Sequence, residues 1–195
     1  TPNQQAEPAV DWLLKNKGKD FFLVGSDYVY PRTANTIMKE QLKAKGGKLV
    51  GEDYLPLGNT EVAPIIAKIK KFAGEGKKTA VVSTINGDSN VPFYKELGNQ
   101  GLKATDVPVV AFSVGEEELA GIDTKPLLGH LAAWNYFMSA DTPENKAFIE
   151  AWKTFIKDDK RVTNDPMEAH YIGFNMWVNA VTQAGTTDVD AVSDA

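Results

Sequence analysis

The chain has 195 residues, of which 43% are hydrophobic and 24% charged, ordinary values for a globular protein that buries a core. The formal net charge is −5 and no lysine–arginine cluster is present, which argues against nucleic-acid binding because phosphate contacts need a basic face. The absence of cysteine excludes disulfides and thiolate chemistry. No apolar run reaches the roughly 18 residues that a membrane-spanning helix needs.

The hydrophobic pattern alternates between strand-like and helix-like segments along most of the chain. Apolar runs predict strands over residues 21–25, 48–55, 78–84, 107–113 and 129–137. Apolar residues at a spacing of 3.6 predict helices over 4–16, from Pro31 to the Gly46-Gly47 pair, and over 62–72, 89–100 and 116–120. A helix is also expected to begin at Thr142. Another should begin at Asp165, which forms a capping box with Glu168.

This alternation predicts an α/β fold. Strands joined by helices of 10–15 residues form right-handed βαβ units, and such units build a mostly parallel sheet with helices on both faces. We therefore expect a three-layer, doubly wound arrangement over 1–195, as one compact unit. Apolar residues such as Tyr171 and Phe174 are expected to line the buried side of the last long helix.

The segment 21–32 is the most informative part of the chain. Its apolar run stops at Gly25-Ser26-Asp27, and tyrosines follow at the alternate positions 28 and 30. In an extended segment alternate side chains share a side. Tyr28 and Tyr30 are thus predicted to face a cleft together, while Val29 points into the core between sheet and helix.

Polar side chains follow several predicted strands where each strand ends. Because the carboxyl ends of parallel strands meet at one edge, where open sheets bind ligands, these side chains should converge. A mixture of hydroxyls, amide, carboxylates and aromatic rings suits a small, neutral, polar ligand. The alternative is that Ser26, Asp88 and Ser113 only cap helices, and that Glu116 belongs to an ordinary acidic first turn. The candidate residues are Ser26, Tyr28, Tyr30, Asn86, Gly87, Asp88, Ser113 and Glu116.

Motifs of known enzyme classes are absent from the sequence. It has no G-x-S-x-G nucleophile motif, no phosphate-binding P-loop and no G-x-G-x-x-G dinucleotide motif. His130 and His170 lie 40 residues apart, outside any zinc pattern, and each is expected to be satisfied or solvent-facing. No catalytic residue, no metal site and no cofactor is therefore predicted, although an enzyme on a flavodoxin-like sheet stays as a minor alternative.

Several motifs in the same order resemble the urea and short-chain amide receptors of ABC transporters. These receptors are type I periplasmic binding proteins, related to the branched-chain amino-acid receptors. Many relatives have phenylalanine at the position of Tyr30 and amide-sensing ones have tyrosine, so both urea and a simple amide stay open as ligands. The motifs are GSDYVYPRTAN (25–35), YLPLG (54–58), TINGDSN (84–90), FSVGEEE (112–118), AAWNYF (132–137) and DTPEN (141–145).

The resemblance implies a protein of two α/β lobes that clamp a ligand between them, of which this chain is the second lobe. Tyr28 and Tyr30 would then form aromatic walls, Asp88 would accept hydrogen bonds from ligand NH₂ groups, and Ser113 would add a polar contact. The implied partners are the missing first lobe, a small polar ligand and a membrane permease, in the periplasm and without nucleic acid. A cytoplasmic amide sensor of the same fold is the alternative, as is a receptor for branched-chain amino acids.

Overall fold

The computed structural model describes residues 2–74, 79–120 and 122–195. It divides the chain into two compact units, Thr1–Asn135 and Tyr136–Ala195, where the sequence suggested one.

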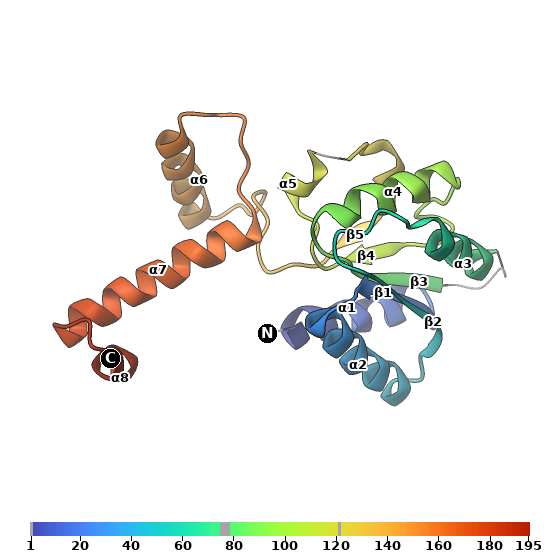
Figure 1. Ribbon diagram of the computed structural model, residues 1–195, viewed down its shortest axis with the longest axis horizontal. Coiled ribbons are helices and arrows are strands. Elements are labelled where there is room, and N and C mark those ends of the chain that lie inside the picture. Colours follow the sequence, from blue (N-terminus) through green and yellow to red (C-terminus); the bar gives the residue numbers. More distant parts are fainter. Residues whose placement is uncertain (1, 75–78, 121) are drawn as a thin grey trace. The chain divides into compact units, whose positions relative to one another are not determined.

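The first unit is built on a five-stranded sheet in the order β2-β1-β3-β4-β5, in which every neighbouring pair is parallel (Figure 1). This confirms the predicted fold class. Lys78, predicted to begin the third strand, lies outside the described residues. The strands are β1 (Asp20–Ser26), β2 (Lys48–Leu55), β3 (Thr79–Thr84), β4 (Val109–Ala111) and β5 (Leu131–Ala132).

Helices cover both faces of this sheet (Figure 1). Along β1, Phe21 and Leu23 pack with helices α1 (Pro2–Asn16) and α2 (Val29–Ala44). The alternate residues Phe22 and Val24 pack with α3 (Ala63–Ala73) and α4 (Asn90–Asn99) on the other face. A strand buried on both faces explains why 21–25 reads as a continuous apolar run. The three-layer prediction is confirmed for the first unit.

The last two strands are much shorter than the predicted segments 107–113 and 129–137. Pro108 has no backbone N–H to give to a ladder, so β4 begins only at Val109. β5 ends at Ala132, and Tyr136, which was predicted to lie in this strand, instead bonds through its hydroxyl to Asn145 and Thr163. The short elements η1 (Gly87–Ser89), α5 (Glu116–Leu119) and η2 (Lys125–Leu127) complete this unit.

The second unit contains helices α6 (Pro143–Ile156), α7 (Asp165–Ala184) and α8 (Val189–Asp194). Thr142 caps α6 as expected, because its hydroxyl accepts the Asn145 N–H at 3.2 Å. The predicted cap Asp165 is wrong: Asn164 caps α7 by accepting the Met167 N–H at 3.1 Å. The expected core role of α7 is also wrong within this unit. None of its residues is buried, and Phe174 is 62% exposed.

Gly25 allows α2 to approach the end of β1 closely. A Cβ at this position would stand 2.4 Å from Thr84 Oγ1 and 2.8 Å from Pro31 Cβ, which is closer than real Cβ contacts come. Tyr54 Cε1 would be 3.5 Å away. Residues from β3, α2 and β2 therefore converge where β1 ends, and only a residue without a side chain fits between them.

We expect Gly25→Ala to destabilise the protein by about 1–3 kcal/mol, the usual cost of overpacking a core. Gly74→Ala is the control, since its added Cβ would meet only backbone carbonyls, the nearest at 3.4 Å. Urea denaturation of both variants measures the difference. Equal stabilities would contradict the close packing.

His130 joins the turn before β5 to the start of β4. Its Nδ1 accepts the Val109 N–H at 3.0 Å, so the ring is neutral in the folded state. Burial lowers the pKa of His130 to about 4. The unfolded chain binds a proton near the ordinary histidine pKa of about 6.5, so the folded state loses stability as the pH falls from there towards 4.

Between pH 7 and 4.5 we expect this histidine to cost about 2 kcal/mol of stability, a figure reduced because the ring is only partly buried. His130→Gln keeps an acceptor for Val109 but does not titrate. Denaturation at both pH values should show a smaller loss for His130→Gln than for the parent chain. Identical losses would show that His130 is not responsible.

Candidate functional site

Ser26 and Asn86 connect the carboxyl ends of β1 and β3. Ser26 is fully buried as the last residue of β1, and its Oγ accepts the Asn86 N–H at 3.0 Å. This serine therefore holds the turn after β3 instead of capping α2, whose start has no side-chain cap. Its contribution to a site is to place Asn86.

Tyr28 reaches the same turn from the other side. Its hydroxyl accepts a hydrogen bond from Asn86 Nδ2, and its ring lies 6.2 Å from the ring of Tyr30, tilted by 47°. Both tyrosines are half-buried. The structure thus brings Ser26, Tyr28, Tyr30 and Asn86 together at the carboxyl edge.

The predicted reason for this pairing is wrong. Helix α2 begins at Val29, two residues before Pro31, so 28–30 is not an extended segment. Val29 is 76% exposed and does not enter the core. Tyr30 packs partly against the core on the α1–α2 side, and burial, followed by the nearby Tyr28, raises its pKa to about 12.

Gly87 and Asp88 form the exposed part of the turn after β3. Gly87 has φ +64°, a left-handed conformation that suits glycine. Asp88 is exposed within η1, and its carboxylate has no hydrogen bond or ion pair among the described residues. The N-cap of α4 is Ser89, without a side-chain hydrogen bond. Asp88 is therefore not serving as a helix cap.

Ser113 and Glu116 lie beyond β4, at the same edge of the sheet. Ser113 is half-buried, two residues after the strand ends, and it caps no helix. Glu116 opens α5, in which the Glu118 carboxylate accepts the Gly115 N–H at 2.8 Å. The acidic turn thus has a structural use, as the alternative interpretation held. The Trp134 ring lies beside Gly115.

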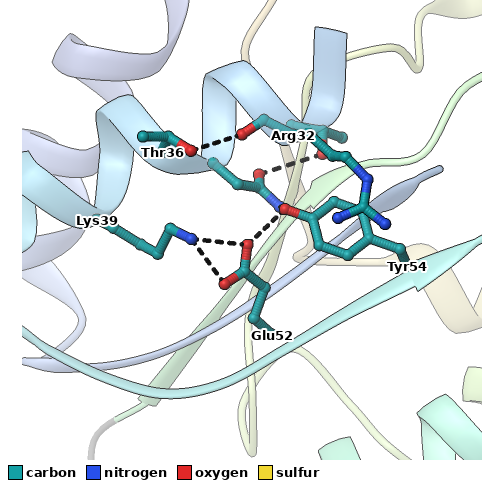
Figure 2. A network of polar contacts seen from close by, with 7 residues as sticks. Arg32, Thr36, Lys39, Glu52 and Tyr54 are labelled. Atoms are coloured by element: carbon teal, nitrogen blue, oxygen red, sulfur yellow. Dashed lines mark hydrogen bonds and ion pairs between the residues drawn. The ribbon is translucent and has the colours of Figure 1, made fainter. Parts of the chain in front are cut away.

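A polar network behind the tyrosines was missed from the sequence. Tyr54 on β2 is its centre: its hydroxyl receives a hydrogen bond from Asn35 Nδ2 at 3.1 Å and donates to Glu52 (Figure 2). Glu52 also forms an ion pair with Lys39 at 2.9 Å. Burial first, and then the bond to Glu52, raises the pKa of Tyr54 to about 12.

The network continues into the buried end of the sheet and out to its surface. Asn35, fully buried, accepts the Thr84 hydroxyl at 3.3 Å, which ties α2 to β3. On the outside, Arg32 Nε donates to Asp27 at 2.6 Å and the guanidinium lies over the Tyr54 ring (Figure 2). The bond from Arg32 lowers the pKa of Asp27. A signal for this network was present in the sequence, because Arg32 and Asn35 are three residues apart and so lie on one face of a helix.

The chemistry of this edge is that of recognition by hydrogen bonds. Asp88 supplies a free carboxylate acceptor, while Tyr28 and Asn86 are already oriented by each other. Within the described ranges no group of three or more His, Asp or Glu side chains could hold a metal ion. No described helix is long and apolar enough to cross a membrane.

Known proteins resemble this chain in sequence and in fold. A Leu/Ile/Val-binding protein homolog 6 from Brucella melitensis is 28% identical over 149 residues, which are 75% of this chain and 37% of that protein. A solute-binding protein of an ABC transporter from Rhodopseudomonas palustris HaA2, solved with p-hydroxybenzoic acid, is 28% identical with a TM-score of 0.85. The match covers 98% of this chain and 52% of that one.

A branched-chain amino-acid ABC transporter ligand-binding protein from Burkholderia xenovorans LB400 has the same fold, with a TM-score of 0.75 at 19% identity over 96% of this chain and 48% of its own. The chain thus spans about half the length of these solved structures. The family model described as periplasmic binding protein domain matches residues 1–195. With its parallel sheet and polar carboxyl edge, the chain belongs to the periplasmic binding protein family, of the type I fold.

Proposed function

We propose that this chain is part of a solute receptor that binds urea or a short-chain amide and delivers it to the membrane permease of an ABC transporter in the periplasm. The observation that carries the proposal is the free Asp88 carboxylate at the edge where Tyr28 and Asn86 meet. An amide NH₂ group is a donor that needs such an acceptor, and its carbonyl needs donors such as a tyrosine hydroxyl.

Each candidate residue has a distinct part in this proposal. Tyr28 and Tyr30 form an aromatic wall, Asp88 accepts from the ligand, and Ser113 adds a half-buried hydroxyl. The backbone turn at Gly87 brings main-chain groups to the same edge, while Ser26 and Asn86 fix the turn. Glu116 contributes a second carboxylate from α5.

We further propose that the receptor has two lobes and that the remainder of the protein supplies the other half of the site. The solved relatives are about twice as long as this chain. Taken by itself, the second unit leaves large apolar side chains exposed, which fits a surface that packs against another part of the protein. These are Phe155, Tyr171, Ile172, Phe174, Met176, Trp177, Val178 and Val189.

Receptors for aromatic acids form a second candidate class. The structure with 28% identity was solved with p-hydroxybenzoic acid, which carries a carboxylate. Binding such a ligand requires a cation or several N–H donors in the site. Titration with benzoate beside acetamide and urea separates the two classes. A clear preference for benzoate would overturn the amide proposal.

Asp88→Ala should weaken ligand binding by roughly 1.5–3 kcal/mol, the range for hydrogen bonds to a charged group. Glu40→Ala on the exposed side of α2 is the control, since it removes a carboxylate far along the helix. Calorimetry on the complete receptor measures both. Unchanged affinity in Asp88→Ala together with a lower melting temperature would assign Asp88 a structural role instead.

The isolated chain should fold but bind urea or acetamide only at millimolar dissociation constants or weaker. A ligand of four heavy atoms gains at most about 6 kcal/mol even in an enclosed site, and half a site offers fewer partners in open water. Parallel titrations of the 195-residue chain and the complete receptor test this. Micromolar binding by the chain alone would contradict the two-lobe site.

A further inference from the structure

Positive charge is scarce at the carboxyl edge of the sheet. Within the first unit, up to Asn135, the segments that follow the five strands contain no lysine, arginine or histidine, whereas they contain Asp27, Glu61 and Asp88. Arg32 is the one lysine or arginine within the first four residues of α2, α3, α4 and α5. Among these described residues, a ligand carboxylate arriving at Tyr28 therefore has one cation available.

The charge of Arg32 is already engaged. Its Nε donates to Asp27 Oδ1 at 2.6 Å, and its guanidinium carbon lies 4.4 Å from the centre of the Tyr54 ring. Figure 2 shows the guanidinium lying beside that ring. A planar guanidinium that is both stacked and paired keeps its position better than a flexible lysine would.

The Tyr54 side chain, on which Arg32 stacks, is itself held in place by hydrogen bonds. Asn35 and Glu52 hold the Tyr54 hydroxyl from two sides, and Lys39 neutralises Glu52 (Figure 2). The Tyr54 ring therefore does not swing away to release the guanidinium. Asp27 and Arg32 flank Tyr28 and Tyr30 in the sequence, and the Arg32 backbone N–H donates to the Tyr28 carbonyl at 3.3 Å, so the backbone of this pair adjoins that of Tyr28.

We propose that the Asp27–Arg32 ion pair, which stacks on the Tyr54 ring, makes this edge of the sheet select uncharged ligands. Because Asp27 already balances the charge of Arg32, the arginine attracts a ligand carboxylate only weakly. This inference rests on the proposed receptor function and names the ligand class. A ligand carboxylate would have to share Arg32 with Asp27 and would also meet Asp88, in the turn after the neighbouring strand β3. Like charges in a closing cleft are strongly unfavourable, whereas a neutral amide meets no such cost.

The test compares matched ligand pairs of nearly equal shape: acetamide with acetate, and benzamide with benzoate. Calorimetry at low salt is applied to the complete receptor, to Asp27→Asn, and to the double variant Asp27→Asn with Arg32→Gln. The parent should prefer the amide of each pair. In Asp27→Asn the freed guanidinium should improve carboxylate binding relative to amide binding by at least about tenfold, the effect of one charge-assisted hydrogen bond.

The double variant identifies the cation, because the gain should disappear when Arg32 is also removed. A gain that persists there would overturn the inference, as would an unchanged preference in an Asp27→Asn protein with a normal melting curve. A parent receptor that binds carboxylates better than amides would overturn it as well.

A second measurement does not depend on the receptor function. In the ¹⁵N spectrum, benzoate should shift the Arg32 Nε–H signal of Asp27→Asn but not that of the parent. If benzoate shifts only the Asp27→Asn signal while neither amides nor carboxylates bind tightly to the complete protein, the proposed receptor function is wrong. The inference that Asp27 keeps Arg32 from binding a carboxylate is then still supported. Equal shifts in both proteins would show that Asp27 does not keep Arg32 from binding a carboxylate, even if amides bind to the complete protein.

Discussion

The architecture of the first unit depends on the close approach of four elements around Gly25, one residue before the end of β1. Thr84 of β3 and Pro31 of α2 lie within the space that a Cβ there would need, and Tyr54 of β2 would be in ordinary contact with it. Because α2 begins so near the strand, Tyr28 at its cap reaches Asn86 in the turn after β3. The steric constraint of one glycine thus places the candidate site.

Buried hydrogen bonds fix the positions of the elements that meet around Gly25. Ser26, Asn35 and Thr84 are fully buried, and each uses its side chain to join two elements at the carboxyl end of the sheet. Buried polar groups cost free energy unless they are paired, so such a network favours one arrangement over its alternatives. The exposed Asp88 carboxylate, which has no hydrogen bond or ion pair among the described residues, is the group that we propose for ligand recognition.

The charged side chains near this edge also divide into those that are paired within the structure and those that are not. The cations near the edge, Arg32 and Lys39, are each paired with a carboxylate, and the carboxylates at the turns carry the remaining charge. The proposed selectivity for amides rests on the pairing of Arg32 and not on the fold, because function depends on the side chains of a site more than on the fold that carries them.

The sequence by itself determined the α/β class, the strand-to-helix order and the edge at which Ser26, Tyr28, Asn86 and Asp88 gather. These follow from local periodicity and from the geometry of parallel sheets. Only the tertiary structure decided that α2 starts at Val29 and that Asn35, Tyr54 and Thr84 form one network. The network depends on hydrogen bonds between residues 19 and 49 positions apart, which no local pattern encodes.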